Sequence, residues 1–125
     1  MRPEKIERDA VTDILSRETF LAAITFDDKG LVPVIAQSVV TGEVLMFAWM
    51  SRETLQTTLS TGHVTYWSRS RKAAWHNGAT SGNTQRLVEA WVDCDGDVLL
   101  LKVDQMGPAC HTGAPTCFFR RAEML

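Results

Sequence analysis

The stretch RLVEAWVDCDGDVLLLKV, residues 86–103, decides the fold class that we predict for this chain. Two β-rich runs, 86–94 and 97–103, flank the dipeptide Asp95-Gly96. An Asp-Gly pair between two such runs is among the strongest short signals for a β-hairpin. We therefore expect an antiparallel hairpin here, and the rest of the domain is built outward from it.

Three more runs upstream have the composition of strands, which is rich in β-branched and aromatic residues. LVPVIAQSVV (31–40) is followed by a Thr41-Gly42 turn, and EVLMFAW (43–49) returns from that turn. HVTYWS (63–68) is the third run. These runs predict a second antiparallel hairpin and one further strand.

Two segments predict helices. Residues 3–24 are charged with apolar side chains on one face, which indicates an amphipathic helix. A short helix is expected over 52–60, because Ser51 can cap its start and Gly62 stands where a helix ends. The tail 105–121 holds too many Gly and Pro residues for a helix. The predicted class is α+β: a β-rich domain with antiparallel hairpins and two short helices.

Composition limits the possible classes of protein. The 125 residues are 45% hydrophobic and 22% charged, which suits one globular domain over 1–125 and excludes a disordered, collagen-like or coiled-coil chain. The net charge of −2 argues against binding nucleic acid through phosphate neutralisation. No apolar run is long enough for a signal peptide or a membrane span, so we expect a cytoplasmic protein without a membrane partner.

The three cysteines, Cys94, Cys110 and Cys117, all lie in the last third of the chain. Their number is odd, and in a reducing cytosol clustered cysteines are more often ligands or reactive thiols than disulfides. Three thiolates with a fourth position open to water are typical of catalytic zinc. The spacing lacks the C-x-x-C pairs of zinc ribbons, so three unrelated buried thiols are an equal alternative at this point.

Three carboxylates alternate with other residues in DCDGD, at Asp93, Asp95 and Asp97. If they share one face of a strand end, they lie about 7 Å apart and repel one another unless a cation intervenes. Oxygen ligands of this kind suit Mg²⁺, and a cation here would offset the excess negative charge of a three-thiolate zinc site. The alternative is a solvated acidic hairpin tip. An EF-hand is excluded, because Val98 stands at its glycine position and Asp104 at its final glutamate.

Two histidines are candidate proton carriers, His111 and His63. His111 follows Cys110 directly, but neighbours in extended structure point in opposite directions, which disfavours a Cys-His nucleophilic pair. We expect His111 or His63 to act as a general acid or base. His76 is a weaker candidate.

The polar segment 69–84 combines cations, hydroxyls and glycines, which suits a phosphate. Trp67 and Trp75 flank its basic residues and can stack on a ring. The alternative is a solvated basic loop. The candidate substrate-binding residues are Trp67, Ser68, Arg69, Ser70, Arg71, Lys72, Thr80, Ser81, Gly82 and Asn83.

Taken together, these motifs resemble one family. YWSRSR (66–71), WHNGATSGN (75–83), DCDGD (93–97) and GPACHTGAPTCF (107–118) occur in the order found in phosphoribosyl-AMP cyclohydrolases of histidine biosynthesis, and LVPVIAQ (31–37) and TGEVLMFAWM (41–50) match the upstream part. The resemblance covers about residues 30–120, so 1–29 would be an N-terminal helical extension and 30–120 the catalytic core. The family often has Asp, Lys and Glu where this chain has Ser38, Asn77 and Ala79.

The resemblance implies an intertwined homodimer with active sites shared between the chains. It implies that Cys94, Cys110 and Cys117 bind Zn²⁺ with ligands from both chains, and that Asp93, Asp95 and Asp97 bind Mg²⁺. The implied reaction is hydrolysis of the N1–C6 bond of the adenine ring in phosphoribosyl-AMP, a small-molecule nucleotide. Another zinc hydrolase, such as a deaminase, is a weaker reading, because the H-x-E…P-C-x-x-C signature is missing. A zinc-stapled dimerisation module is the non-enzymatic alternative.

Overall fold

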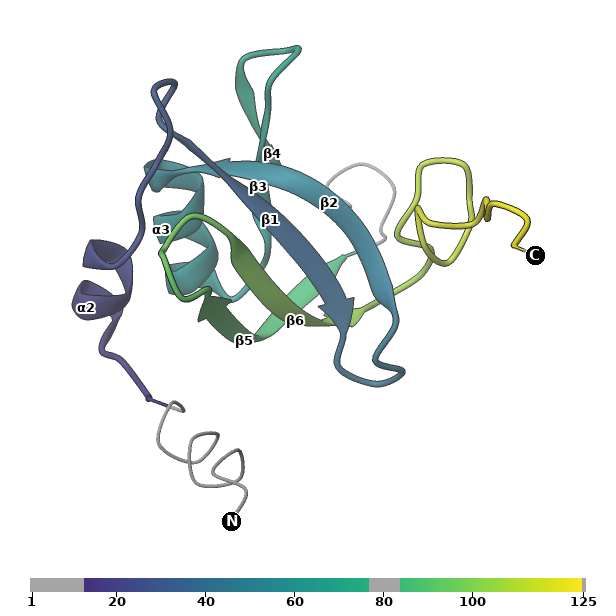
Figure 1. The fold of residues 1–125 in the computed structure, drawn as a ribbon, viewed down its shortest axis with the longest axis horizontal. Coiled ribbons are helices and arrows are strands. Elements are labelled where there is room, and N and C mark those ends of the chain that lie inside the picture. The colour runs from purple at the N-terminus through teal and green to yellow at the C-terminus, as the bar shows by residue number, and fades with distance from the viewer. Residues whose placement is uncertain (1–12, 77–83, 125) are drawn as a thin grey trace.

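The computed structural model describes residues 13–76 and 84–124, and in this part the chain forms a curled six-stranded sheet with two helices (Figure 1). The strand order is β4-β3-β2-β1-β6-β5. The elements are α2 (Arg17–Ala22), β1 (Leu31–Ser38), β2 (Val44–Ser51), α3 (Arg52–Thr61), β3 (Thr65–Ser68), β4 (Ala73–His76), β5 (Gln85–Val92) and β6 (Leu99–Gln105).

The predicted hairpins are present, but the sheet as a whole is mixed. β1 pairs with β2, and β5 with β6, in antiparallel register as expected. The central pair β1–β6 is parallel, and Ile35 of β1 lies beside Leu100 of β6. This pairing joins two hairpins that lie far apart in the sequence. The expected β-rich domain with antiparallel hairpins and two helices is therefore confirmed, and the parallel pairing of β1 with β6 is a feature that the sequence did not predict.

Helix α3 begins and ends where the sequence indicates. The Ser51 side chain accepts a hydrogen bond from the Thr54 backbone N–H, and the Thr54 hydroxyl accepts one from the Ser51 backbone N–H, which forms a capping box. Gly62 ends the helix with φ of 79°, a left-handed conformation that favours glycine. The Thr58 hydroxyl then accepts the Thr65 N–H, so α3 is tied directly to β3.

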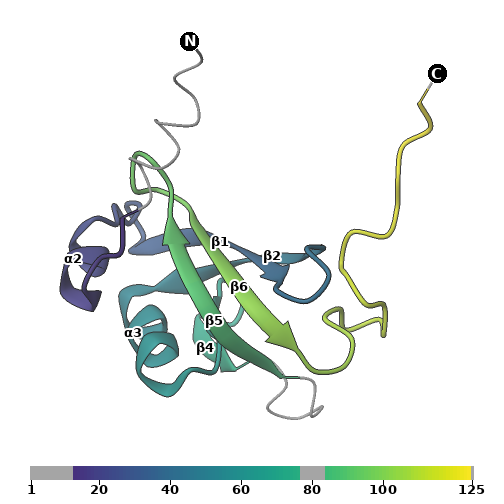
Figure 2. The same cartoon turned by 90° about the horizontal axis from the view of Figure 1, so that it is seen from below.

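The sheet curls until its two ends meet around α3 (Figure 2). The segment before β3 bonds to β5: the Val64 N–H donates to the Gln85 carbonyl at 3.0 Å, and the Leu87 N–H donates to the Gly62 carbonyl at 2.8 Å. Alternate residues of the strands point into the enclosed core, where Val34 and Leu101 are fully buried. The other face of the central strands points away from α3.

A buried polar contact crosses this core. The Tyr66 hydroxyl donates to Gln85 Oε1 at 2.6 Å, and Gln85 Nε2 donates to Gln105 Oε1 at 2.8 Å. Burial, together with the nearby Cys117 thiolate, raises the pKa of Tyr66 far above its ordinary value, so its hydroxyl stays a donor. The contact therefore fixes the junction between β3 and β5.

A Tyr66→Phe variant is expected to lower the free energy of unfolding by about 1–3 kcal/mol, because Gln85 Oε1 is left buried without its donor. Urea unfolding followed by circular dichroism measures this loss. In the double variant Tyr66→Phe/Gln85→Leu the two losses should not add, because both remove the same hydrogen bond. Strict additivity would contradict the assignment.

Two expectations for the elements are wrong within the described residues. The predicted helix over 3–24 falls partly outside the described part, and of residues 13–24 only Arg17–Ala22 is helical. Ser16 starts the helix by accepting the Thr19 N–H, and Phe20 is buried in the core. No strand was predicted within the polar segment 69–84, yet its residues 73–76 form β4 against β3. Four residues are too few to show an alternating pattern in the sequence.

Candidate metal and active site

The three aspartates lie in the turn 93–98 between β5 and β6. Asp93 Oδ1 accepts the backbone N–H groups of Asp97 at 3.0 Å and Val98 at 3.3 Å, which shapes the turn. One oxygen atom from each of Asp93, Asp95 and Asp97 lies within 4.8 Å of the others, and all three residues are exposed. They were expected at a strand end and the adjoining turn, and the structure places all three in the turn, because β5 ends at Val92 before the first of them. A turn gathers them more closely than a strand would.

The carboxylates influence one another strongly. Hydrogen bonding to Asp95 and Asp93, followed by their negative charges, raises the pKa of Asp97. Desolvation raises the pKa of Asp93, but the hydrogen bonds that it accepts from Asp97 and Val98 outweigh this and lower it overall. The turn therefore gathers three mutually repelling carboxylates. A cation between them would relieve this repulsion, so the three aspartates can bind a metal ion.

Gly96 lets the aspartate turn pack closely against the N-terminal segment. The sequence alone did not predict this role. Its φ is 80°, and the Thr25 backbone N–H donates to its carbonyl at 2.8 Å. A Cβ atom at this position would collide with the Ala23 carbonyl oxygen. The glycine itself was visible in the sequence. Its contact could not be predicted, because the partner lies more than seventy residues away in the chain.

Two of the three cysteines meet in the loop that follows β6. The Cys117 backbone N–H donates to the Leu45 carbonyl of β2 at 2.7 Å, and the Cys110 N–H donates to the Ala114 carbonyl at 3.2 Å. The two thiols lie close enough for each to shift the pKa of the other. The loop thus holds two thiols near each other beside β2.

The environment gives these two thiols different acidities. The Thr112 hydroxyl donates to Cys110 Sγ at 3.1 Å and, with the Thr112 backbone, lowers the pKa of Cys110. Burial and the neighbouring Cys110 raise the pKa of Cys117 to about 11. A more acidic thiol beside a less acidic one is a donor pair that zinc can bind by displacing the protons. Thr112 was not among the predicted site residues, although a hydroxyl two positions after a cysteine in a turn is a recognisable signal.

A Thr112→Val variant is expected to move the titration of Cys110 to higher pH. The hydroxyl stabilises the thiolate, so its removal raises the pKa of Cys110 and delays the appearance of the reactive form. Alkylation of metal-free protein across a pH series, read for each cysteine by mass spectrometry, measures the shift. Thr57→Val, an exposed change on α3, is the matched control. An unchanged profile for Cys110 would refute the role of the hydroxyl.

Cys94 lies apart from the other two cysteines. It is an exposed residue of the turn 93–98, before β6 begins, whereas Cys110 and Cys117 follow the far end of that strand (Figure 1). Seven residues of strand span about 20 Å. Among the described residues, the group placed close enough to share a metal ion is the aspartate cluster and does not include the three cysteines. One copy of the chain therefore does not bring the three thiols together.

The candidate phosphate-binding residues lie on the projecting β3–β4 hairpin. Its tip carries Arg69, Arg71 and Lys72, which are exposed. The Arg71 N–H donates to Ser68 Oγ at 3.3 Å, and Ser68 Oγ lies 3.4 Å from Ser70 Oγ. Trp67 of β3 lies beside Trp49 of β2. The remaining candidates, Thr80, Ser81, Gly82 and Asn83, lie outside the described residues.

One cation of this hairpin is held against the sheet. The Arg69 guanidinium carbon lies 4.6 Å from the centre of the Trp49 ring, and Trp49 packs edge-on against Phe47 at 5.6 Å. Stacking of this kind fixes the direction of the guanidinium group. The sequence did not predict the contact, because it joins two strands through their side chains.

The two candidate histidines lie on different parts of the fold. His111 is exposed on the cysteine loop, and its backbone helps to lower the pKa of Cys110. His63 lies between α3 and β3, where it forms an isolated bridge with Arg86 of β5. The structure therefore brings His111, but not His63, directly beside a cysteine pair.

A cavity of about 630 Å³ opens beside the aspartate turn. Leu15 and Phe20 line one side, and Trp91, Asp93 and Cys94 line the other. Its volume is in the range of small-molecule sites, and its wall combines an aromatic ring with the candidate metal ligands.

Comparison with known proteins places the chain in a family. A model of the family described as phosphoribosyl-AMP cyclohydrolase matches residues 46–119, which include the aspartate turn and the cysteine loop. The chain belongs to the phosphoribosyl-AMP cyclohydrolase family. A phosphoribosyl-AMP cyclohydrolase of Micrococcus luteus is 61% identical over 104 residues, which cover 83% of this chain and 82% of that protein.

Two further relatives carry the same name. The protein from Alkalilimnicola ehrlichii is 58% identical over 103 residues, covering 82% of this chain and 72% of the relative. The protein from Azoarcus sp. strain BH72 is 56% identical over 103 residues, which cover 82% of this chain and 79% of the relative. The resemblance seen in the sequence is thus confirmed, and so is the expectation that this chain is an enzyme of the cyclohydrolase family. In the described part of the chain, neither helix has the length and apolar character needed to cross a membrane.

Proposed function

We propose that this chain hydrolyses the N1–C6 bond of the adenine ring in phosphoribosyl-AMP, as a cytoplasmic step of histidine biosynthesis, with Zn²⁺ and Mg²⁺ bound. Family membership supports the reaction class. The observation that carries the site is the division of its ligands: a two-thiol loop at one end of β6 and a turn with one thiol and three carboxylates at the other. We assign residues 30–120 to the catalytic core and 1–29 to an N-terminal extension.

The division of thiols is the reason to propose a homodimer with shared sites. Cys110 and Cys117 of one chain would be joined by Cys94 of a second, which completes a three-thiolate zinc site with one open position. The same arrangement brings the carboxylates of the second chain to the first chain's cysteine loop. When bound, zinc supplies the polarisation that makes a water molecule nucleophilic at neutral pH.

The chain's own residues have separate tasks in this proposal. Asp93, Asp95 and Asp97 hold Mg²⁺, whose charge offsets that of the thiolates and attracts an anionic nucleotide. His111, next to the cysteine loop, accepts a proton from the attacking water and returns it to N1 as the bond breaks. His63 is the second candidate for this transfer.

The β3–β4 hairpin would bind the phosphates of the substrate. Arg71 and Lys72 project freely from its tip, and the stacked Arg69 offers a fixed guanidinium fork, which suits a phosphate oxygen pair. We assign Trp67, Ser68 and Ser70 to the same subsite. We extend it to Thr80, Ser81, Gly82 and Asn83 from the sequence motif alone.

Incubation with phosphoribosyl-AMP, Zn²⁺ and Mg²⁺, followed by ultraviolet absorbance, tests the proposal. We expect a change in absorbance as the ring opens, loss of turnover in Asp95→Ala and Asp97→Ala, and a lower Mg²⁺ affinity in both. Glu89→Ala removes a carboxylate outside the turn and is the matched control. Folded, metal-loaded protein that leaves the substrate intact would overturn the proposed reaction.

A further inference from the structure

The register of β2 and β3 places an aromatic ring against one cation of the β3–β4 hairpin. Trp49 of β2 pairs with Trp67 of β3, so their side chains point to the same face of the sheet. Arg69 follows Trp67 by two residues and so lies diagonally opposite Trp49, within reach of a long side chain. This register explains why the Arg69 guanidinium carbon lies 4.6 Å from the centre of the Trp49 ring.

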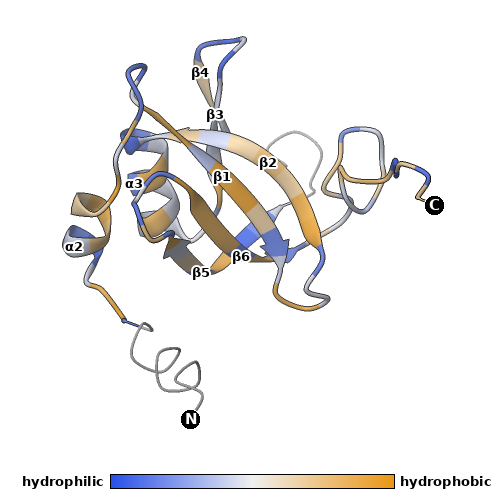
Figure 3. Ribbon diagram, in the orientation of Figure 1, coloured by the Kyte–Doolittle hydropathy of each residue, from blue (hydrophilic) through white to orange (hydrophobic). Residues whose placement is uncertain are grey.

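The Trp49 ring is itself held in place by the sheet. Phe47, two residues earlier on β2, meets it edge-on, with the ring planes at 88°, which is a favourable arrangement of two aromatic rings. Trp49 is partly buried, whereas Arg69 is exposed. Figure 3 shows the same change, with hydrophobic colour along β2 and hydrophilic colour at the tip of the β3–β4 hairpin. The contact therefore ties an exposed cation to a rigid part of the fold.

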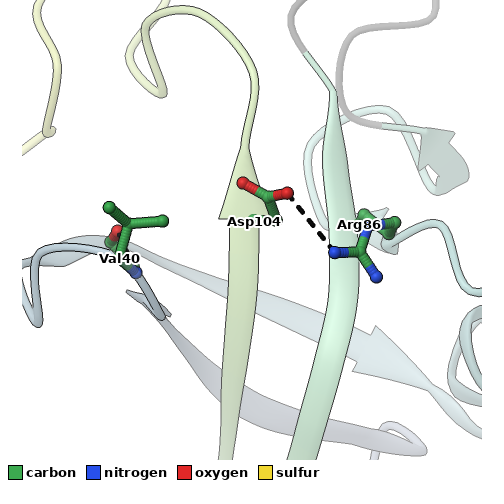
Figure 4. Close-up of polar contacts among 4 residues, drawn as sticks. Val40, Arg86 and Asp104 are labelled. Atoms are coloured by element: carbon green, nitrogen blue, oxygen red, sulfur yellow. Dashed lines mark hydrogen bonds and ion pairs between the residues drawn. The ribbon is translucent and has the colours of Figure 1, made fainter.

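The stacked guanidinium keeps its charge available to an anion. Two ion pairs occur in the described part of the chain: Arg86 donates to Asp104 Oδ2 at 3.4 Å (Figure 4), and Lys102 Nζ lies 3.9 Å from Glu89 Oε1. Neither of them includes Arg69. An aromatic ring contacts the flat face of a guanidinium and leaves its N–H edge open. Arg69 can therefore offer two parallel N–H donors to one phosphate.

An arginine that is held in advance binds a phosphate more tightly than a free one. A long side chain that a ligand has to immobilise loses rotamer freedom, which weakens the affinity by about twofold to twelvefold. Stacking on Trp49 restricts Arg69 before the ligand arrives, so this loss does not accompany binding.

We propose that Trp49 is a positioning residue of the phosphate subsite, whose ring holds the Arg69 guanidinium in the direction that suits a phosphate of the nucleotide. This inference rests on the proposed function, which assigns Arg69 to that subsite. It adds a residue of the neighbouring strand that acts through Arg69 and does not contact the phosphate itself. Such a residue affects the affinity for the ligand and not the rate of the chemical step.

Binding of AMP to the full-length, zinc-loaded protein, measured by isothermal titration calorimetry, tests the proposal without requiring turnover. Trp49→Leu removes the ring and should weaken AMP binding by about threefold to tenfold. Adenosine, which lacks the phosphate, should bind Trp49→Leu as it binds the wild type. Trp49→Tyr keeps a ring face and should bind AMP within about twofold of the wild type.

The matched control removes a similar contact elsewhere in the fold. The Arg52 guanidinium carbon lies 4.7 Å from the centre of the Phe26 ring, at the start of α3. Phe26→Leu should therefore bind AMP as the wild type does. Far-UV circular dichroism and sedimentation velocity check that every variant keeps the wild-type fold and state of association. Trp49→Met, which also lacks a ring, replaces Trp49→Leu if that chain does not fold.

A double-variant cycle tests whether Trp49 acts through Arg69. In a chain that already carries Arg69→Leu, the change Trp49→Leu should weaken AMP binding no further. With phosphoribosyl-AMP as substrate, Trp49→Leu alone should raise KM by about threefold to tenfold and leave kcat within about twofold.

The outcomes separate the positioning role from the reaction. Weaker AMP binding in Trp49→Leu that is restored in Trp49→Tyr and absent in the Arg69→Leu background supports the role. Unchanged AMP binding in folded Trp49→Leu overturns it, as does a wild type that binds no AMP. An equal loss for adenosine also overturns it, because the ring would then contact the base. A protein that binds AMP as expected but leaves phosphoribosyl-AMP intact upholds the role of Trp49 and contradicts the proposed function.

Discussion

A Cys110→Ala variant is expected to lose its zinc and to turn over phosphoribosyl-AMP at less than about 0.1% of the wild-type rate, because water is a poor nucleophile without the metal. Cys110 has the lowered pKa of the cysteine pair, so its thiolate forms first and is the proposed first ligand. Its removal leaves Cys117, whose pKa is raised to about 11, without its partner. Zinc content by chelator titration and the change in ultraviolet absorbance measure the two losses.

Ala109→Ser is the control for this variant, because it changes a small side chain in the same loop and keeps all three thiols. It should retain its zinc and most of its activity. Wild-type turnover by Cys110→Ala would show that zinc on this loop does not activate the water. Normal turnover with normal zinc content would also remove Cys110 from the ligand set.

A Gly96→Ala variant is expected to lower the free energy of unfolding by about 3 kcal/mol. The left-handed backbone at φ of 80° costs a residue with a Cβ atom roughly 1–2 kcal/mol. The new methyl group also has to displace the Ala23 carbonyl, which is rigid backbone, and overpacking of this kind costs about 1–3 kcal/mol. Urea unfolding followed by circular dichroism measures the total.

Gly62→Ala is a matched control for the collision. Gly62 has φ of 79°, almost the same conformation, but a Cβ atom there would meet no atom within 4 Å. Gly62→Ala should lower the free energy of unfolding only by the cost of the left-handed backbone conformation, roughly 1–2 kcal/mol. Equal losses in the two variants would show that the aspartate turn does not press against the N-terminal segment.

Local signals in the sequence predicted the local elements of the fold. The Asp-Gly turn between two β-rich runs and the capped helix after Ser51 are both present. The helix expected over 3–24 failed among residues 13–24, because Ser16 caps a much shorter helix. β4 and the parallel pairing of β1 with β6 depend on contacts between distant segments, and a single sequence does not reveal these.

The candidate site was likewise predictable from the sequence only in part. The spacing in the sequence predicted that the three aspartates lie close together, and the structure gathers them in the turn between β5 and β6. Spacing did not predict that Cys94 stands apart, because this depends on the tail folding back onto β2. Thr116 directs that return: its hydroxyl donates to the Val44 carbonyl at 2.7 Å, and the next residue bonds to Leu45. The roles of Gly96 and Thr112 are contacts between backbone and side chains that appear only in the folded chain.

Subunit exchange between two inactive variants tests the shared site most directly. Cys94→Ala and Cys110→Ala each damage both sites of a homodimer. In a mixed dimer, Cys94 of the Cys110→Ala chain faces the intact Cys110 and Cys117 of the other, which restores one site. Equal mixing should therefore recover about a quarter of wild-type activity, since half of the dimers are mixed and each has one working site. A mixture of folded, exchanging dimers that stays as inactive as its parents would contradict the shared site.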